Sequence, residues 1–265
     1  MNQDRIKELL IKVREPREEF SVIMTGKASK KVNGFYRYDE RTIYLHNKNF
    51  KSDSDMIYTA IHEYTHHLQI CENPQLSASG ARCHSRSFWA LFHTLLDEAE
   101  SKGVYTPLYR TDSELTAMAE RLKNKYLKDN AAFMLEFGRE LTKAYTLCTE
   151  KGVRFEDFAD RCLGLPRTEA KTLIAVSSVP GTDPSLGWEN LKTLTRIRDE
   201  EMLHQAEAAF REGKSSDFVK EEFLTKPARK VQTEEERLLE EKKRLERTIS
   251  SLEKRLEEIN RRLEN

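Results

Sequence analysis

The stretch Ile61–Leu68, with the sequence IHEYTHHL, decides how the rest of this chain is interpreted. It contains the pattern HExxH. On an α-helix, residues four apart lie on one face, so His62 and His66 can hold a single metal ion. Glu63 projects beside them, where a carboxylate can take a proton from water on the metal. The competing interpretation is a charged helix face that carries two histidines by chance, and the surrounding sequence has to decide between them.

Composition narrows the classes of protein. The chain has 265 residues, of which 34% are charged and 38% hydrophobic, which is typical of a strongly helical protein with a modest core. Its 45 basic and 45 acidic residues give a formal net charge of zero, so global charge provides no argument for a nucleic-acid or membrane partner. No apolar run has transmembrane length and the N-terminus has no apolar signal core, so we expect a cytoplasmic protein without a membrane partner.

The cysteines argue against two other kinds of site. Cys71, Cys83, Cys148 and Cys162 show no CxxC spacing. This excludes the usual pattern of a zinc ribbon or of a dithiol redox motif. In an intracellular protein the four thiols are expected to be reduced.

A small sheet is predicted ahead of the HExxH motif. Residues 3–14 have the apolar spacing of a helix, and residues 19–25 read as a strand. Residues 34–38 and 42–46 flank a polar turn at 39–41 and predict a β-hairpin. Its edge strand could bind an extended peptide by backbone hydrogen bonds, or the hairpin could only cover the helix.

Two amphipathic helices are predicted around the motif. The first is capped within residues 52–55, begins near Met56 and ends near Cys71, before Asn73 and a proline. A polar loop over residues 72–83 follows. The second helix opens at residues 84–89 and runs to about Glu100, with Gly103 just past its end.

A catalytic zinc usually takes three protein ligands and leaves one position for water. Five of the seven histidines lie between residues 62 and 93. We predict His84 as the third ligand, because a loop-to-helix junction can fold back onto the first helix. His93 lies in an apolar run typical of a packed core histidine, and Glu98 or Glu100 would make a glutamate-type site. His67 is about 100° around the helix from His66, so it either orients a neighbour or faces solvent.

The order of these elements resembles the SprT-like (Spartan-type) zinc metallopeptidases. The resemblance covers about residues 1–110 and rests on the hairpin, the HExxH motif, a loop of seventeen residues, and His84 followed by Phe88. It implies a zincin-like fold, a Zn²⁺ ion held by His62, His66 and His84, and Glu63 as the catalytic general base. Phe88 would match the aromatic residue that packs the helix of the third ligand.

The resemblance also implies a reaction and a substrate class. Zinc would lower the pKa of a water molecule and polarise the scissile carbonyl of a protein or peptide substrate, while Glu63 transfers the proton to the leaving amine. The developing negative charge needs a stabilising group, for which Tyr44, Tyr64 and Arg86 remain open candidates. Several relatives carry a four-cysteine zinc ribbon that binds DNA, and this chain lacks that pattern.

The character of the sequence changes after residue 110. One helix is predicted from the cap at 112–113 to about Tyr126, and another from about Asn130 to Cys148. A short helix at 155–163, a turn at Gly164 and a helix from Thr168 to Ile174 give the outline of a helix-turn-helix. Arg167, Thr168 and Lys171 stand where a recognition helix would begin. Basic and acidic residues are nearly balanced between residues 138 and 178, which favours helical packing or partner binding over DNA contact.

The C-terminal part is also predicted to be helical. A long helix is expected from about Leu186 to Arg211 and a short one at residues 216–224, followed by a linker with a basic cluster at 226–230. In the tail from residue 233, apolar residues recur at Leu238 and Leu245, and past Leu245 their gaps alternate between four and three, the period of a coiled coil. We expect self-association through residues 233–265; the alternative is a single charged helix stabilised by ion pairs.

These observations define the prediction as a whole. The fold class is α+β, with a zincin-like domain at 1–110, an all-α domain at 111–225 that includes the helix-turn-helix outline, and a linker with a coiled-coil helix at 226–265. The predicted function is that of an intracellular zinc-dependent metalloendopeptidase. The alternative is a DNA- or partner-binding regulatory protein whose metallopeptidase-like domain is a scaffold or cleaves a repressor.

Overall fold

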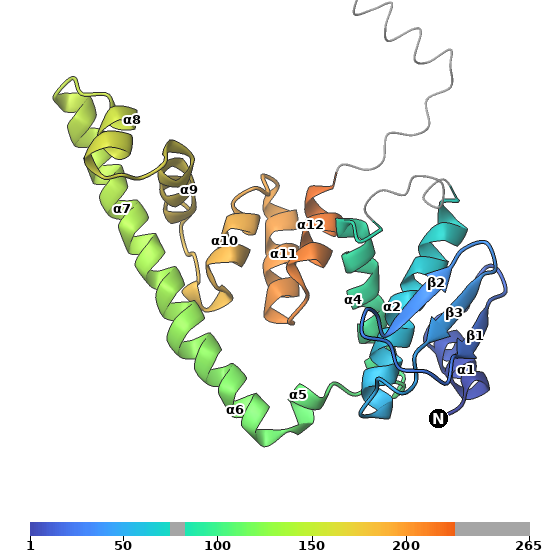
Figure 1. The fold of residues 1–265 in the computed structure, drawn as a ribbon. Helices are drawn as coiled ribbons and strands as arrows, with labels where there is room; N and C mark the ends of the chain where they lie inside the picture. The colour runs from blue at the N-terminus through green and yellow to red at the C-terminus, as the bar shows by residue number, and fades with distance from the viewer. Residues whose placement is uncertain (75–82, 226–265) are drawn as a thin grey trace, which may run out of the picture. The chain divides into compact units, whose positions relative to one another are not determined.

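Helices dominate the computed structural model, which describes residues 1–74 and 83–225 (Figure 1). A three-stranded sheet accompanies them, so the α+β class is confirmed. Buried apolar side chains form two clusters, one around the sheet and one among the helices that follow residue 130. The predicted linker and coiled coil at 226–265 lie outside the described residues, as does most of the predicted loop at 72–83.

The sheet has the strand order β1-β3-β2. Strand β1 (Ser21–Met24) pairs in parallel with β3 (Thr42–Leu45), and β2 (Gly34–Arg37) pairs antiparallel with β3. The predicted strand and hairpin are therefore confirmed. A Cβ atom on Gly34 would lie only 2.9 Å from the carbonyl oxygen of Tyr44, so the close approach of β2 requires glycine at this position.

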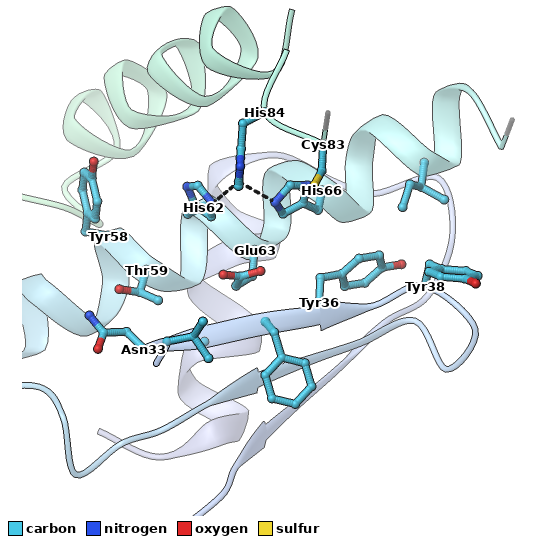
Figure 2. A pocket seen from close by; sticks show the side chains of 14 residues that line it. Asn33, Tyr36, Tyr38, Tyr58, Thr59, His62, Glu63, His66, Cys83 and His84 are labelled. Atoms are coloured by element: carbon cyan, nitrogen blue, oxygen red, sulfur yellow. Dashed lines mark hydrogen bonds between the residues drawn. The ribbon is translucent and has the colours of Figure 1, made fainter. Parts of the chain in front are cut away.

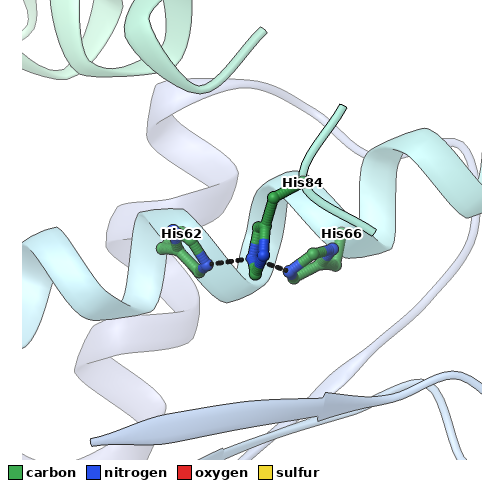
Figure 3. A group of neighbouring side chains, drawn as sticks. All are labelled: His62, His66 and His84. Atoms are coloured by element: carbon green, nitrogen blue, oxygen red, sulfur yellow. Dashed lines mark hydrogen bonds between the residues drawn. The ribbon is translucent and has the colours of Figure 1, made fainter. Parts of the chain in front are cut away.

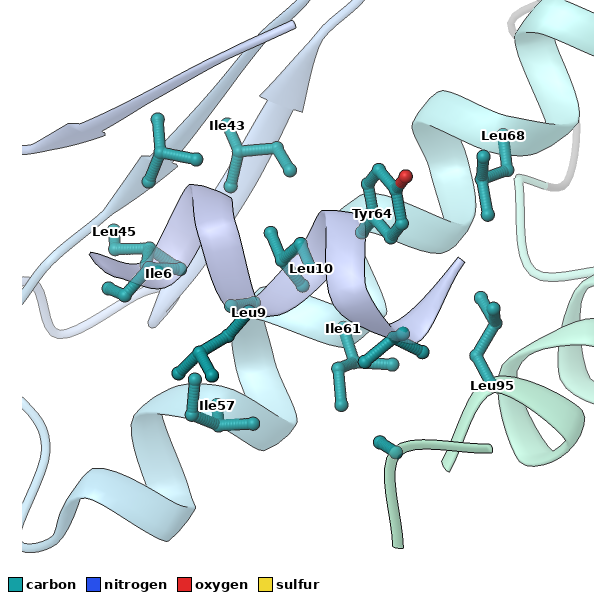
Figure 4. Packing of buried hydrophobic residues seen from close by; sticks show 14 of the residues in the cluster. Ile6, Leu9, Leu10, Ile43, Leu45, Ile57, Ile61, Tyr64, Leu68 and Leu95 are labelled. Carbon is teal, nitrogen blue, oxygen red and sulfur yellow. The ribbon is translucent and has the colours of Figure 1, made fainter. Parts of the chain in front are cut away.

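Two helices pack on the sheet and on each other. They are α1 (Gln3–Val13), which confirms the predicted helix at 3–14, and α2 (Asp53–Glu72), which carries the HExxH motif. Figure 4 shows the interdigitated side chains of this core, which include Ile6, Leu10, Ile43, Leu45, Ile57 and Ile61, all with 0 to 2% of their surface exposed. Full burial of such a side chain contributes about 1.5–3 kcal/mol, so the apolar face of α2 is fixed firmly against the sheet.

Serine caps begin both helices around the motif. The Ser52 hydroxyl accepts a hydrogen bond from the backbone N–H of Asp55 at 3.1 Å and starts α2. The Ser85 hydroxyl accepts one from the backbone N–H of Phe88 at 3.2 Å and starts α4 (Arg86–Ser101). Helices α2 and α4 pack against each other, which places the N-terminus of α4 beside the motif.

The chain between residues 113 and 150 corrects one prediction. After the short helix α5 (Leu108–Thr111), the backbone stays helical through α6 (Ser113–Arg121), the π-helical turn η1 (Leu122–Leu127) and α7 (Lys128–Glu150). Two helices separated near residues 127–130 were expected. That junction contains neither glycine nor proline, and the wider π-turn absorbs the shift in the apolar pattern without ending the helix.

The predicted helices on either side of Gly164 are present. They are α8 (Phe155–Asp157) with the π-turn η2 (Phe158–Cys162), and α9 (Arg167–Ser177). Helix α9 packs closely along α7. A Cβ atom on Gly138 of α7 would lie 2.3 Å from the carbonyl oxygen of Leu173, so this contact between the two backbones requires glycine.

The predicted long helix from Leu186 to Arg211 is wrong. The structure has a 3₁₀ turn η3 (Pro184–Leu186), α10 (Trp188–Leu194) and a separate α11 (Glu200–Arg211). The break occurs because the Asp199 carboxylate caps a new helix, accepting a hydrogen bond from the backbone N–H of Met202 at 2.9 Å. The predicted short helix is confirmed as α12 (Ser216–Leu224), which packs against α4.

Candidate metal centre

The structure brings together the three histidines predicted as metal ligands (Figure 3). His62 and His66 project from adjacent turns of α2, and His84 comes from the segment immediately before the α4 cap. The Nε2 atom of His84 lies 3.0 Å from Nε2 of His62 and 3.2 Å from Nε2 of His66. One nitrogen of each ring lies within 4.8 Å of the others, so the three side chains are close enough to bind one metal ion.

The chemistry of these donors suits a metal. Around a tetrahedral zinc with bonds of about 2.0–2.1 Å to nitrogen, two ligand nitrogens are separated by roughly 3.3–3.4 Å. The observed 3.0 and 3.2 Å are close to that separation. Burial and the neighbouring His84 lower the pKa of His62 to about 4, while burial and both neighbouring imidazoles lower the pKa of His66 to about 3. Both rings are therefore neutral at pH 7 and offer a lone pair.

Phe88 lies beneath all three imidazoles. Its ring centroid is 4.4 Å from that of His66, 4.8 Å from that of His84 and 4.9 Å from that of His62. Phe88 is fully buried, and Trp89 stacks on His84 with centroids 5.6 Å apart. An aromatic floor of this kind restricts the ring orientations before any metal binds.

Glu63 lies on the side of α2 that faces strand β2 (Figure 2). Its residue surface is only 7% exposed, and desolvation raises the pKa of the carboxyl group to about 7, although a hydrogen bond from the Tyr36 backbone acts in the opposite direction. A carboxyl group with a pKa near neutrality can both accept and release a proton at physiological pH.

A cavity of about 590 Å³ opens in front of these residues. Its lining combines His62, Glu63, His66 and His84 with apolar and aromatic side chains, of which the largest are Phe35, Tyr36, Tyr38 and Tyr58. Figure 2 shows α2 on one side of this space and the strand β2 on the other. A volume of this size accommodates several side chains of a bound molecule.

His67 forms part of the support behind the cavity. It was expected either to orient a neighbour or to face solvent, and because it is fully buried the second alternative is wrong. Its Nε2 donates to the carbonyl oxygen of Glu18 at 3.0 Å, and its Nδ1 accepts from the hydroxyl of Tyr36 at 2.9 Å. It therefore fixes the position of Tyr36, which the sequence did not single out. In the sequence, only the alternation of side chains between the two faces of the predicted strand could have indicated that Tyr36 points toward α2.

The other candidates for the third ligand have different partners. Glu98 forms an ion pair with Arg14, and Glu100 forms one of 2.7 Å with Arg110. His93 is partly buried, and its Nδ1 lies 2.7 Å from the hydroxyl of Ser215. None of the three belongs to the histidine group found among the described residues.

Two of the candidates for stabilising negative charge are also engaged elsewhere. The hydroxyl of Tyr64 donates to the carbonyl oxygen of Arg14 at 2.6 Å, and that of Tyr44 donates to Glu40 at 2.6 Å. Neither residue lines the cavity.

In the predicted helix-turn-helix, the guanidinium of Arg167 forms an ion pair with the carboxylate of Asp160, which partly neutralises its charge.

Comparisons with protein-family models, with curated proteins and with solved structures find no match for this chain. Within residues 1–74 and 83–225, no helix has both the length and the apolar character that crossing a membrane requires.

Proposed function

We propose that this protein is a zinc-dependent metallopeptidase with a zincin-like, SprT-like N-terminal domain. The observation that carries the proposal is the convergence of His62, His66 and His84 beside the buried carboxylate of Glu63. Three imidazoles with an adjacent carboxylate are the donor set of a catalytic zinc site, which keeps a position open for water.

Each residue of the site has a separate role in the proposed hydrolysis. Bound zinc supplies a Lewis acid that polarises the scissile carbonyl and makes water more acidic. His62, His66 and His84 hold the ion, and the Phe88 ring limits the movement of their imidazoles. Glu63 accepts a proton from the attacking water and donates it to the amine of the leaving peptide.

Strand β2 supports a peptide as the substrate. Among the described residues it pairs only with β3, and it borders the cavity. An extended peptide can add to such an edge through backbone hydrogen bonds, which recognise a main chain and not a particular sequence. The apolar and aromatic cavity lining favours large apolar side chains next to the cleaved bond.

The test measures metal content and peptide hydrolysis in the same preparations. We expect about one zinc ion per wild-type chain, in accord with a single set of three protein ligands and one open position. His84→Ala should lose most of the zinc, because one ligand is removed. His93→Ala is the matched control, since this histidine lies on α4 away from the cluster.

Glu63→Gln separates catalysis from metal binding. The amide is nearly isosteric but cannot accept the proton, so zinc content should stay near wild type while hydrolysis of an unfolded protein substrate falls by about 10²–10⁴-fold. A zinc-loaded wild type without hydrolytic activity against a panel of unfolded proteins would contradict the peptidase proposal. A folded wild type that does not bind zinc would contradict the metal site itself.

A further inference from the structure

Two loops at one end of the sheet carry a concentrated positive charge. They are residues 26–33, between β1 and β2, and residues 46–51, between β3 and α2, and we call them the lysine loops. Every residue in them with a formal charge is an exposed lysine: Lys27, Lys30, Lys31, Lys48 and Lys51. The ion pairs found within residues 1–74 and 83–225 include none of these five ammonium groups.

Hydrogen bonds join the two lysine loops to each other. The side chain of Asn49 accepts a hydrogen bond from the backbone N–H of Ser29 at 2.9 Å and donates one to the carbonyl oxygen of Ser29 at 2.7 Å. The side chain of Asn47 accepts one from the backbone N–H of Gly26 at 2.8 Å. The lysines of both loops therefore belong to one surface, where a negatively charged partner would relieve their mutual repulsion.

The carboxylates that follow the lysine loops do not cancel this charge. Asp53 and Asp55 lie in the first turn of α2. Asp53 is 3.8 Å from the N-terminal amino group of Met1, and the positive end of the helix dipole partly neutralises both carboxylates. Five lysines against these two aspartates leave three positive charges in excess.

The lysine loops lie at one end of the cavity. Val32 and Asn33, the last residues of the first loop, line it, and Figure 2 shows Asn33 at the opposite end from Tyr38. Since a chain of three residues spans at most about 11 Å, the Cα atom of Lys31 is no farther than this from that of Gly34. No lysine, arginine or aspartate is among the described residues that line the cavity itself. Selection by charge would therefore act beside the cavity and not at the metal centre.

The free edge of β2 leads toward the first lysine loop. The carbonyl oxygen of Asn33 accepts a hydrogen bond from the backbone N–H of His46 at 2.8 Å, so the polar backbone groups of Asn33 point toward the chain of β3. Those of Gly34 and Tyr36 point the other way, because the direction alternates along a strand. In agreement, the backbone of Tyr36 forms a hydrogen bond with Glu63 in the cavity. An extended peptide that pairs with Gly34 and continues past it would reach the lysine loops.

From these observations we infer that the substrate carries a run of acidic residues on one side of the cleaved bond, and that the lysine loops bind this run. The inference rests on the proposed function, since it takes β2 as the strand on which the peptide binds. Complementary charge of this kind contributes mainly to specificity and to the rate of association. The two directions of a peptide along β2 place the acidic run on opposite sides of the cleaved bond, so the experiment includes both.

The first experiment measures binding without cleavage. The probes are fluorescein-labelled synthetic peptides that share a core of leucine and phenylalanine and carry a run of glutamates or of glutamines, either before or after the core. Fluorescence anisotropy gives their Kd for the zinc-loaded full chain with Glu63→Gln. In one of the two orders, the glutamate run should bind at least about tenfold more tightly than the glutamine run. This advantage should shrink at high salt.

A charge reversal in the first lysine loop tests which residues provide the advantage. Added to the Glu63→Gln chain, K30E/K31E should bring the ratio of the two Kd values to about one or below, because like charges then face the glutamate run. The matched control is K125E/K171E, which changes the net charge equally. Lys125 and Lys171 are also exposed, lie on η1 and α9, and take part in none of the ion pairs of the described residues. This control should keep the ratio of the unaltered chain.

Hydrolysis of the same peptides by the zinc-loaded wild type separates this inference from the proposed function. We expect the glutamate run to raise kcat/KM in the order that binds more tightly, mainly through a lower KM, since the run lies away from the reacting atoms. Hydrolysis without any preference between glutamate and glutamine would overturn the inference and leave the peptidase proposal intact. A preference in binding without any hydrolysis would contradict the peptidase proposal and leave the acidic partner.

Three further results would overturn the inference. Equal Kd values for the glutamate and glutamine peptides in both orders would show that the lysine loops do not select a substrate. An equal loss of the advantage in K30E/K31E and K125E/K171E would assign it to net charge alone. A short single-stranded oligodeoxynucleotide that binds more tightly than the glutamate peptides, and loses this affinity in K30E/K31E, would make the lysine loops a nucleic-acid site instead.

Discussion

The hydroxyl of Tyr36 donates a hydrogen bond of 2.9 Å to Nδ1 of His67, which ties strand β2 to the helix that carries His62 and His66. The opposite ring nitrogen, Nε2, donates to the carbonyl oxygen of Glu18, and burial lowers the pKa of His67. The neutral imidazole therefore has its proton on Nε2 and accepts at Nδ1. The distance between β2 and α2, which sets the width of the cavity, depends on this pair.

Removing the hydroxyl should destabilise the protein. Tyr36→Phe leaves the buried Nδ1 of His67 with only the weak thiol donor of Cys71, 3.8 Å away, so we expect the free energy of unfolding to fall by about 1–3 kcal/mol. Urea denaturation of the metal-free protein measures it. Tyr38→Phe is the matched control, because Tyr38 is 55% exposed, and it should have almost no effect. Equal stability of the two variants would contradict the structural role of the bond.

Gly138→Ala should also destabilise the protein. On helix propensity alone, alanine would stabilise α7 by about 0.5–1 kcal/mol. The added Cβ would lie 2.3 Å from the carbonyl oxygen of Leu173, so α7 and α9 must separate, at a cost of about 1–3 kcal/mol. The prediction is therefore tested by the sign of the change in the free energy of unfolding, measured by thermal or urea denaturation. A variant more stable than wild type would show that α7 and α9 are not packed this closely.

Asp199→Ala should weaken the N-terminus of α11. The lost cap to the backbone of Met202 is expected to lower the free energy of unfolding by about 0.5–2 kcal/mol. Asp199→Asn keeps an oxygen acceptor and should retain most of that stability. If alanine were tolerated as well as asparagine, the break between α10 and α11 would have another cause.

The burial of His93 should make stability depend on pH. Burial lowers the pKa of His93 below its ordinary value of 6.5, and the carboxylates of Asp217 and Asp97 oppose this shift. Below about pH 6.5 the unfolded chain therefore binds more protons than the native state, so the free energy of unfolding falls as pH decreases through this window.

The measurement compares metal-free wild type with His93→Gln. Other buried histidines contribute in the same direction, so the informative quantity is the difference between the two proteins in stability lost from about pH 7.5 to about pH 5.5. We expect the variant to lose less. An identical loss in both proteins would show that His93 does not titrate differently in the native state.

Much of the local structure followed from short-range patterns. The helical spacing around the HExxH motif, the cap candidates within residues 52–55 and the hairpin turn predicted α2, the start of α4 and the β2–β3 pair, because these signals act within a few residues. Two predicted helix boundaries were wrong because of other local features of the sequence. No breaker separates α6 from α7, and the capping aspartate at 199 interrupts what apolar spacing alone read as one long helix.

By itself, the sequence determined that His62, His66 and Glu63 share one helix, since four-residue spacing fixes that geometry. The sequence could suggest His84 as a third ligand, but it could not show that this side chain lies beside His62 and His66. The packing of α4 on α2 and the contact with the Phe88 ring decided the position of His84. Glu98 and Glu100 form ion pairs with Arg14 and Arg110 instead of joining the histidine group. The role of Tyr36 also came only from tertiary structure, because burial depends on contacts between residues far apart in the chain.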